Sequence, residues 1–367
     1  MKEHGADLVV IGGGFYGCYL AAHEATRGRR VVLLEAGETP MQLASKVNQA
    51  RIHNGYHYPR SVLTALRSRE SYERFTAEFG QAVRADFTHH YAIARHGSNV
   101  TPQQFALFCE RIGAGLTEVS TAGHFDRTMI DAVFRVKEAA FDAIALRDVM
   151  LERMRVAGVE LLCGTRALRI AKASGGLCVE ASNGTRYTAP RVLNCTYAAM
   201  NDVLAASGLP GVPLKLELVE ILLLHLPPAL QGLGWTIMDG PFWGCLPFPA
   251  FRASSLYHVR YSVHGSWQDE GSASFRPDVQ RPGLERASAA THMLKDAARY
   301  VPRIADSDRA GSAWVIRAKL PGSARTDSRP ILFVPCPAAR GLFHIMGGKI
   351  DNVYDVLPIL DEALGQA

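Results

Sequence analysis

A glycine-rich turn near the amino end constrains the fold of this chain more than any other feature. Three glycines follow the pattern Gly12-x-Gly14-x-x-Gly17. The apolar residues 7–11 precede the turn, and residues 18–26, which have helical character, follow it. This order predicts a strand that passes through a tight turn into a helix.

The same turn predicts a dinucleotide site. Gly12 permits the tight turn, Gly14 lets the backbone approach a pyrophosphate, and Gly17 lets helix and strand pack closely. A second apolar run, residues 31–34, ends in Glu35, where an acid that binds a ribose belongs. No arginine directly follows Glu35, which argues against a 2′-phosphate but leaves NAD and FAD both open.

A polar loop follows the second apolar run. It contains Ala44, Ser45 and Asn48 and continues through His53 to Ser61, with too many hydrogen-bonding side chains for a core element. In this loop the chain resembles the D-amino-acid oxidase superfamily of FAD-dependent oxidoreductases. The part from Ser45 to Ser61 is most similar to the L-2-hydroxyglutarate dehydrogenase branch, and glycine oxidase is another relative.

The resemblance implies an α/β fold in which a Rossmann-like FAD-binding domain is interleaved with an α+β substrate domain. The substrate domain would be built on a mostly antiparallel sheet. The resemblance also implies FAD as the cofactor. Some relatives carry a histidine that bonds covalently to the flavin, and Asn48 stands at that position here, so we expect non-covalent FAD.

Two internal segments share the resemblance. Thr165 and Ala167 match a strand whose backbone contacts the adenine in relatives. Residues 191–198 match a strand that ends beside the cofactor, with Cys195 in place of alanine and Tyr197 in place of glycine. Because tyrosine lacks the conformational freedom of glycine, we expect a different backbone at Tyr197.

A second strand and glycine turn near the carboxyl end repeat the logic of the first. Residues 341–346 lead into Gly347 and Gly348, and Lys349 follows. In relatives this turn faces the flavin pyrimidine edge, where Lys349 would stabilise the negative charge of reduced flavin. The residues expected to contact the cofactor are Gly12, Gly14, Phe15, Tyr16, Gly17, Glu35, Ala36, Ala44, Ser45, Asn48, Gln49, Ala167, Cys195, Thr196, Gly347, Gly348 and Lys349.

His53 is the candidate for proton transfer. Oxidation of a CH–OH carbon needs a base for the hydroxyl proton while hydride leaves the carbon, and neutral imidazole suits that role at neutral pH. The alternative is a structural histidine that holds the loop. His57 follows four residues later, but Gly55 and Pro59 disfavour a helix there, so no metal site is expected.

Arg317 is the candidate for substrate binding. The resemblance implies that this arginine binds the substrate carboxylate, for which a guanidinium fork is a natural bidentate partner. A surface ion pair is the alternative role, and Arg325 or Arg329 could be the ligand instead. With His53 and Lys349, Arg317 completes the predicted catalytic set.

Residues 211–320 predict long, alternating strands typical of a sheet with one wet face. In relatives such a sheet covers the flavin ring. The sequence does not show which face points inward. The possible lining residues are Tyr257, His258, Arg260 and Tyr261.

The two domains are expected to be interleaved along the 367 residues. We assign residues 1–60, 140–210 and 330–367 to the FAD-binding domain. Residues 61–139 and 211–329 would form the substrate domain.

Composition excludes several classes of protein. Hydrophobic residues make up 48% and charged residues 20%, which is ordinary for a globular protein, and the net charge is only +5. With no basic arm and no run of 18 apolar residues, we expect neither nucleic-acid binding nor an integral membrane segment. Seven cysteines without a CxxC pair, and no sign of a signal peptide, favour a cytoplasmic chain.

The sequence therefore predicts an FAD-dependent oxidoreductase, either an oxidase or a dehydrogenase. It would take a hydride from a CH–NH or CH–OH carbon of a small polar substrate, such as an amino acid, an amine or a 2-hydroxy acid. Oxygen or another carrier would accept the electrons. The alternatives are an NAD-dependent dehydrogenase and a flavin-binding module that acts through a partner protein; a role in tRNA modification is disfavoured by the mild charge.

Overall fold

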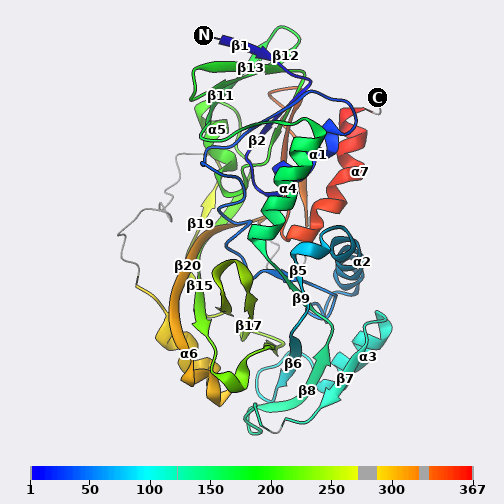
Figure 1. Ribbon diagram of the computed structural model, residues 1–367, viewed down its shortest axis with the longest axis vertical. Coiled ribbons are helices and arrows are strands. Elements are labelled where there is room, and N and C mark those ends of the chain that lie inside the picture. Colours follow the sequence, from blue (N-terminus) through cyan, green and yellow to red (C-terminus); the bar gives the residue numbers. More distant parts are fainter. Residues whose placement is uncertain (1, 122, 272–286, 322–329, 366–367) are drawn as a thin grey trace.

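A parallel sheet forms one half of the molecule, the upper half in Figure 1. The computed structural model describes residues 2–121, 123–271, 287–321 and 330–365. The strands follow the order β10 (Glu160–Leu162), β3 (Val31–Leu34), β2 (Leu8–Ile11), β14 (Arg191–Asn194), β22 (Leu342–Met346) and β21 (Leu332–Pro335). Neighbouring strands are parallel except for β21, which runs antiparallel to β22.

Both faces of this sheet are covered. Leu8 and Val10 of β2 pack with helices α1, α4 and α7, whereas Val9 and Ile11 pack on the opposite side. A strand buried on both faces is apolar throughout, which explains the unbroken run in β2. The helices have the bounds α1 (Phe15–Ala25), α2 (Val62–Glu78), α3 (Pro102–Arg111), α4 (Ala143–Ala157), α5 (Met200–Ala206), α6 (Ala290–Ala297) and α7 (Val353–Leu364).

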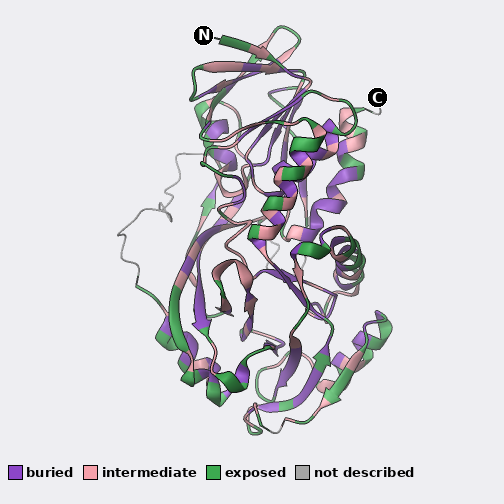
Figure 2. Ribbon diagram, in the orientation of Figure 1, coloured by how far each residue is buried: buried purple, intermediate pink, exposed green. Residues whose placement is uncertain are grey.

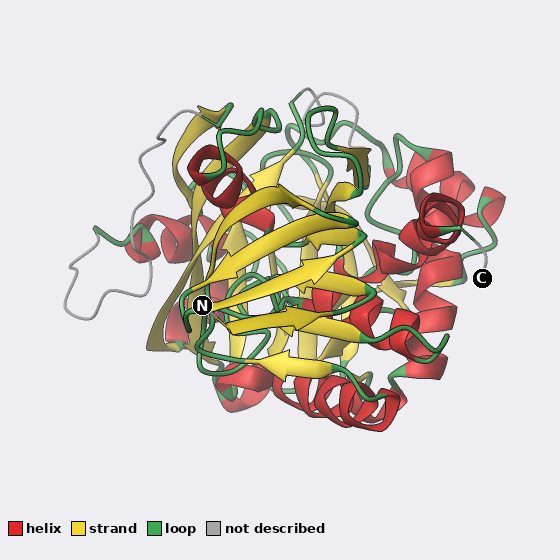
Figure 3. Ribbon diagram, turned by 90° about the horizontal axis from the view of Figure 1, so that it is seen from above, coloured by secondary structure: helices red, strands yellow, loops and turns green. Residues whose placement is uncertain are grey.

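A smaller sheet and α5 cover the second face. Its strands follow the order β1 (Lys2–Gly5), β13 (Thr185–Ala189), β12 (Gly176–Ala181) and β11 (Ala167–Ala173). Figure 3 shows these layers from above, with the strands in the middle and helices along the outside. Three short strands, β4 (Arg51–Ile52), β9 (Ala139–Phe141) and β5 (Val83–Arg84), pair between the two halves of the molecule.

A large mixed sheet forms the other half of the molecule. Most neighbours are antiparallel, and β6 and β16 form a parallel pair. The strands follow the order β19 (Val263–Asp269), β15 (Leu214–His225), β18 (Ala253–His258), β17 (Trp243–Phe248), β16 (Leu233–Met238), β6 (Thr88–Ala94), β8 (Ile130–Val136) and β7 (Leu116–Val119), and β20 (Asp308–Lys319) also pairs with β15.

The large sheet turns one face toward the parallel-sheet half. Val219 and Ile221 of β15 join the same core as α1 and α4, whereas Leu222 and Leu224 pack with α6 on the other face. We call the face that carries Val219 and Ile221 the inner face. Figure 2 shows the buried residues concentrated in the strands of both sheets. The α/β fold and the mostly antiparallel second sheet confirm the predicted fold class.

Candidate active site

The predicted glycine turn lies at the carboxyl edge of the parallel sheet, between β2 and α1. Gly12 has a φ of +100°, and a Cβ atom there would lie 2.9 Å from the Cys195 carbonyl oxygen. A Cβ atom on Gly17 would overlap the Gly12 carbonyl oxygen. Around Gly14 only the Ser45 hydroxyl comes near, at 3.5 Å from a Cβ position. The turn therefore leaves room beside Gly14 at the amino end of α1, which suits an anionic phosphate.

Glu35, at the end of β3, lies beside this turn. Its carboxylate accepts hydrogen bonds from the backbone N–H of Gly13 (2.6 Å) and of Gly37 (2.7 Å). The Glu35 carbonyl accepts a hydrogen bond from the Thr165 N–H at 2.8 Å, which places the start of β11 at Ala167 nearby. The glycine turn, the acid and the adenine-side strand thus meet at one edge of the sheet.

The polar loop after β3 packs against the same turn. The Ser45 hydroxyl accepts a hydrogen bond from the Phe15 N–H at 2.9 Å. The Asn48 amide donates to the carbonyls of Ala44 and Ser45, both at 3.0 Å, and its oxygen accepts from the Ala50 N–H. Asn48 therefore shapes the loop. Ala36 and Gln49 lie in the same region, beside Glu35 and Asn48 in the chain; Ala36 is exposed and Gln49 is half-buried.

The end of β14 closes the turn from the other side. Burial raises the pKa of the Cys195 thiol to about 12, so the thiol stays protonated. The Thr196 hydroxyl donates to the Asn194 side chain at 2.6 Å. Tyr197 has a φ of +55°, in the left-handed region that favours glycine. The expectation of a different backbone at this residue is therefore wrong. The Tyr197 hydroxyl donates to the Ala318 carbonyl at 3.1 Å and ties β20 to this edge.

The second glycine turn follows β22 and adjoins the first. A Cβ atom on Gly347 would overlap the Tyr16 hydroxyl, which donates to the Lys349 carbonyl at 2.8 Å. Gly348 is exposed. The Lys349 ammonium donates to the Ser68 hydroxyl on α2 at 2.6 Å, and its side chain is 8% exposed.

His53 and Lys349 come together around one tyrosine. The Lys349 ammonium lies 5.4 Å from the centre of the Tyr58 ring, and the His53 ring lies 5.4 Å from the same ring. His57 stacks on His53 with ring centres 5.0 Å apart. Residues almost 300 positions apart in the sequence thus line the same place, next to the second glycine turn.

Arg317 lies on the inner face of the large sheet, where it is hydrogen-bonded to Glu217 and Tyr257. It is the cross-strand neighbour of Glu217, whose carboxylate accepts from Arg317 Nε at 3.0 Å and Nη2 at 2.6 Å. Nη2 also donates to the Tyr257 hydroxyl at 2.9 Å. The other predicted arginines, Arg325 and Arg329, lie outside the described residues.

A family model described as FAD dependent oxidoreductase, DAO, matches residues 7–350 of the chain. The chain belongs to this family. The predicted family is therefore confirmed, and the cofactor that the family implies is FAD rather than NAD.

Among curated proteins, the FAD-dependent monooxygenase FPY4 of Fusarium mangiferae is 25% identical over 97% of this chain and 91% of its own length. The FAD-dependent monooxygenase kojA of Aspergillus flavus is 25% identical over 96% and 85%. Glycine oxidase from Geobacillus kaustophilus superposes with a TM-score of 0.70 at 18% identity, covering 98% of this chain and 95% of that one. NikD, an amino acid oxidase, gives 0.72 at 14%, covering 100% and 95%.

The residues present fit the FAD that the DAO family implies. The glycine turn leaves the amino end of α1 open, and Glu35 and Ala167 follow where the ribose and the adenine would lie. The carboxyl ends of β2, β3, β14 and β22 meet here, where α/β sheets bind their ligands. These contacts support the predicted cofactor residues, and the individual assignments stay predictions.

Sequence reasoning missed a buried ion pair beside His53. The Glu138 side chain is fully buried, 3.9 Å from His53 Nδ1 and 3.5 Å from the Arg51 Nε. Burial raises the pKa of Glu138 to about 7, although the Arg51 charge opposes the shift. Arg51 Nη2 also donates to the Thr236 hydroxyl at 2.6 Å. The available signal in the sequence was a charged residue directly before an apolar one: Arg51 before Ile52, and Glu138 before Ala139–Phe141.

Strand register aligns a row of residues across the inner face. Tyr91 pairs with Thr236, Thr236 with Gly244, and Gly244 with Tyr257. Because Gly244 has no side chain, the Arg51 guanidinium lies over it; a Cβ atom there would be 3.1 Å from Nη2. This row lies on the inner face of the large sheet, and Arg51 reaches it from β4.

Four residues in β18 and the turn after it were possible lining residues. Of these, only Tyr257 bonds a described residue of the inner face, Arg317. His258 is buried on the opposite face, where it bonds Asp296 of α6 at 2.9 Å. Arg260 is exposed, and Tyr261 packs against His258. Strand alternation separates Tyr257 from its neighbour His258.

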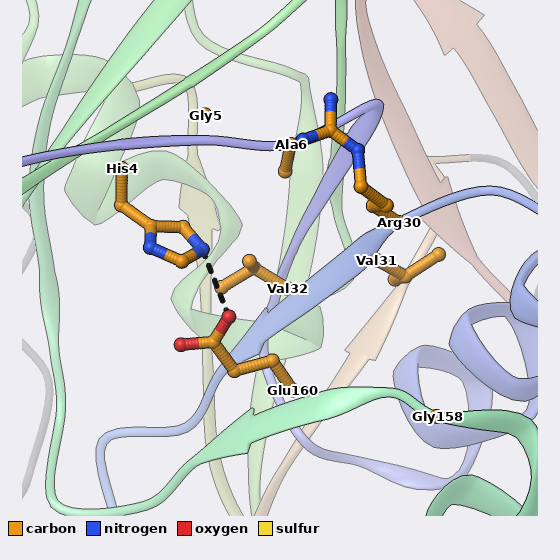
Figure 4. A pocket seen from close by; sticks show the side chains of 8 residues that line it. All are labelled: His4, Gly5, Ala6, Arg30, Val31, Val32, Gly158 and Glu160. Atoms are coloured by element: carbon orange, nitrogen blue, oxygen red, sulfur yellow. Dashed lines mark ion pairs between the residues drawn. The ribbon is translucent and has the colours of Figure 1, made fainter.

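A surface hollow lies at the opposite edge of the parallel sheet from this site. Figure 4 shows the ion pair of His4 and Glu160, 2.9 Å apart, with Arg30 and Val32 beside it. Glu160 and Val32 lie at the amino ends of the parallel strands β10 and β3. DAO-family cofactors would bind at the carboxyl ends, so we assign this hollow no part in the chemistry.

Proposed function

We propose that this DAO-family protein removes a hydride from a CH–OH or CH–NH carbon of a small polar substrate, such as an amino acid, an amine or a 2-hydroxy acid. The observation that carries the proposal is the meeting of His53 and Lys349 around Tyr58, at the edge where the cofactor residues converge. A base and a cation on one side of a flavin site suit this reaction.

Bound FAD supplies the hydride acceptor. His53 accepts the proton of the substrate hydroxyl or amine, and negative charge on the buried Glu138, 3.9 Å from its Nδ1, favours the protonated imidazole. Lys349 would stabilise the negative charge of reduced flavin. Arg317 and Tyr257 orient a polar group of the substrate from the inner face.

Anaerobic reduction tests this function. Purified protein with its FAD is mixed with a panel of amino acids, amines and hydroxy compounds, and the visible flavin absorbance is followed. We expect at least one class to bleach the flavin. If none does, the flavin-binding module that acts through a partner protein becomes the better account.

The role of Lys349 has its own test. Lys349→Met keeps the length of the side chain and removes the charge, so we expect flavin reduction to slow roughly tenfold or more, as on loss of an electrostatic stabiliser. The reduction potential of the bound flavin should fall in parallel. An unchanged potential would assign Lys349 to the packing of α2 through Ser68.

We propose that FAD is bound without a covalent link. Asn48 is engaged with the loop backbone. Acid precipitation of the holoprotein should therefore release the flavin into the supernatant, whereas a yellow pellet would contradict this.

Oxygen or another carrier would take the electrons. The names of the fungal relatives favour monooxygenation as a second candidate, in which one oxygen atom enters the substrate and the other becomes water at the expense of a reduced nicotinamide. Formation of one hydrogen peroxide for each substrate molecule oxidised supports an oxidase. Label from ¹⁸O₂ in the product, with a requirement for NADH or NADPH, supports the monooxygenase.

The interleaved domains, 1–60, 140–210 and 330–367 against 61–139 and 211–329, remain part of the proposal, as does a cytoplasmic location. All seven cysteines are unpaired thiols, which suits a reducing compartment. Within the described residues, no helix is long and apolar enough to cross a membrane.

A further inference from the structure

Glu217 and Arg317 face the flavin-binding half of the molecule as a pair. They are direct cross-strand partners on β15 and β20. Val219 and Val315, two positions along each strand, belong to the core shared with α1 and α4. Because side chains alternate along a strand, Glu217 and Arg317 lie on this same inner face.

The Arg317 edge that would grip a substrate carboxylate is already occupied. Nε and Nη2 both donate to one oxygen of Glu217, and Nη2 donates to Tyr257 as well. The other Glu217 oxygen accepts from the Lys319 ammonium at 3.0 Å. The Glu217 side chain is 6% exposed and that of Arg317 is 27% exposed, so the carboxylate lies beneath the guanidinium.

Glu217 stays ionised in this arrangement. Burial alone would raise its pKa, but the charges and hydrogen bonds of Arg317 and Lys319 outweigh burial and lower the pKa below its ordinary value. An incoming carboxylate would have to displace Glu217 from Arg317 and then remain beside its negative charge. An uncharged oxygen meets neither obstacle.

We propose that Glu217 determines the substrate class by reserving Arg317 for an uncharged oxygen, the hydroxyl or carbonyl of a hydroxylated substrate, rather than for a carboxylate. Among the described residues none accepts a hydrogen bond from Arg317 Nη1. Nη1 and the Tyr257 hydroxyl therefore donate hydrogen bonds to that substrate oxygen. The inference rests on the proposed function, because it assumes that Arg317 faces the substrate.

Ligand binding to the wild-type holoprotein tests the inference without turnover. Glycolate and glycolamide differ in one group, a carboxylate or an amide, and binding against the flavin changes its visible absorbance. We expect glycolamide to act at a concentration at least tenfold lower than glycolate. A glycolate dissociation constant equal to or below that of glycolamide overturns the inference. If neither ligand changes the absorbance, the variants decide.

Three variants isolate the residue. Glu217→Gln keeps the size and one acceptor but removes the charge, so glycolate should bind at least tenfold more tightly than to wild type. The double variant Glu217→Gln with Arg317→Gln should lose that gain, because the gain depends on the guanidinium. Glu180→Gln, on β12, removes an equal charge from the surface pair with Arg186 and should leave glycolate binding unchanged.

The outcomes separate this inference from the proposed function. Glu217→Gln that retains FAD but gains no affinity for glycolate overturns the role of Glu217, whatever the substrate panel shows. A gain that persists in the double variant overturns the part of Arg317. Should Glu217→Gln fail to retain FAD, the comparison of glycolate and glycolamide on wild type remains decisive. Failure of the proposed function would appear instead as a flavin that no panel compound reduces.

Discussion

The two walls of the candidate site are built in different ways. The wall toward the parallel sheet is mostly backbone, in which Gly12, Gly17 and Gly347 stand where any side chain would collide with a neighbour. The other wall, at the inner face of the large sheet, is mostly side chains: Arg51 of β4 pairs with Glu138 and donates to Thr236 on that face.

This difference teaches where variation can occur within a DAO-family scaffold. Backbone contacts to a cofactor tolerate no added atoms, so the first wall can accept only one kind of ligand. Side chains on a sheet can change without moving the strands, so the second wall can be adapted to different substrates.

The largest expected effect comes from Gly17→Ala. The added methyl group would overlap the Gly12 carbonyl, and overpacking of about 3 kcal/mol corresponds to roughly a hundredfold loss of affinity for FAD. The flavin content of the purified protein measures this. Gly265→Ala on β19, where a Cβ atom meets open space, should keep its FAD. Normal flavin content in both variants would break the distinction between the two walls.

His53→Ala tests the side-chain wall. Loss of a positioned base costs about 10²-fold or more, so flavin reduction under anaerobic conditions should slow by that factor while FAD content stays normal. The exposed His225 at the end of β15 gives the matched control, His225→Ala. A normal reduction rate in the His53 variant would make this histidine a structural support of the loop.

The buried Glu138 predicts a dependence of stability on pH. Its pKa rises from 4.5 to about 7 on folding, so the folded state binds the proton more tightly. Its contribution to stability is complete below about pH 4.5 and is lost as the pH rises through about 7, by at most about 3 kcal/mol. Urea unfolding at pH 5 and pH 8 should show a smaller difference in Glu138→Gln than in wild type. Glu180→Gln should behave as wild type; an equal pH dependence in all three would refute the assignment.

Gly244→Ala is expected to have the smallest effect. A methyl group 3.1 Å from Arg51 Nη2 would push the guanidinium from its place beside Thr236 and cost about 1 kcal/mol. The midpoint of urea unfolding measures the change, with Gly265→Ala as the reference. Equal midpoints for the two variants would show that the Arg51 side chain can move aside for the added methyl group at no cost in stability.

Local features of the site could be predicted from the sequence. The turn from Gly12 to Gly17 and the acid Glu35 occupy positions set by spacing within one strand–helix–strand unit. Tyr197 shows the limit of such reasoning. Residue type favoured an ordinary backbone, but the surrounding structure holds a left-handed one, with the hydroxyl anchored on Ala318.

Partners on the large sheet could not be predicted in this way. Glu217 and Arg317 are a hundred residues apart, and only the register of β15 on β20 pairs them. The same holds for Gly244 under Arg51 and for Glu138 beside His53. A shift of one residue would turn each side chain to the opposite face, and nothing local in the sequence reports the register.

The sequence by itself indicated a dinucleotide cofactor, because a turn that approaches a phosphate with its backbone requires glycines at defined intervals. The tertiary structure decided which charged side chains meet at the candidate site and which of them are already paired. That decision depends on strand pairing and burial, which bring together residues whose positions in the chain are unrelated.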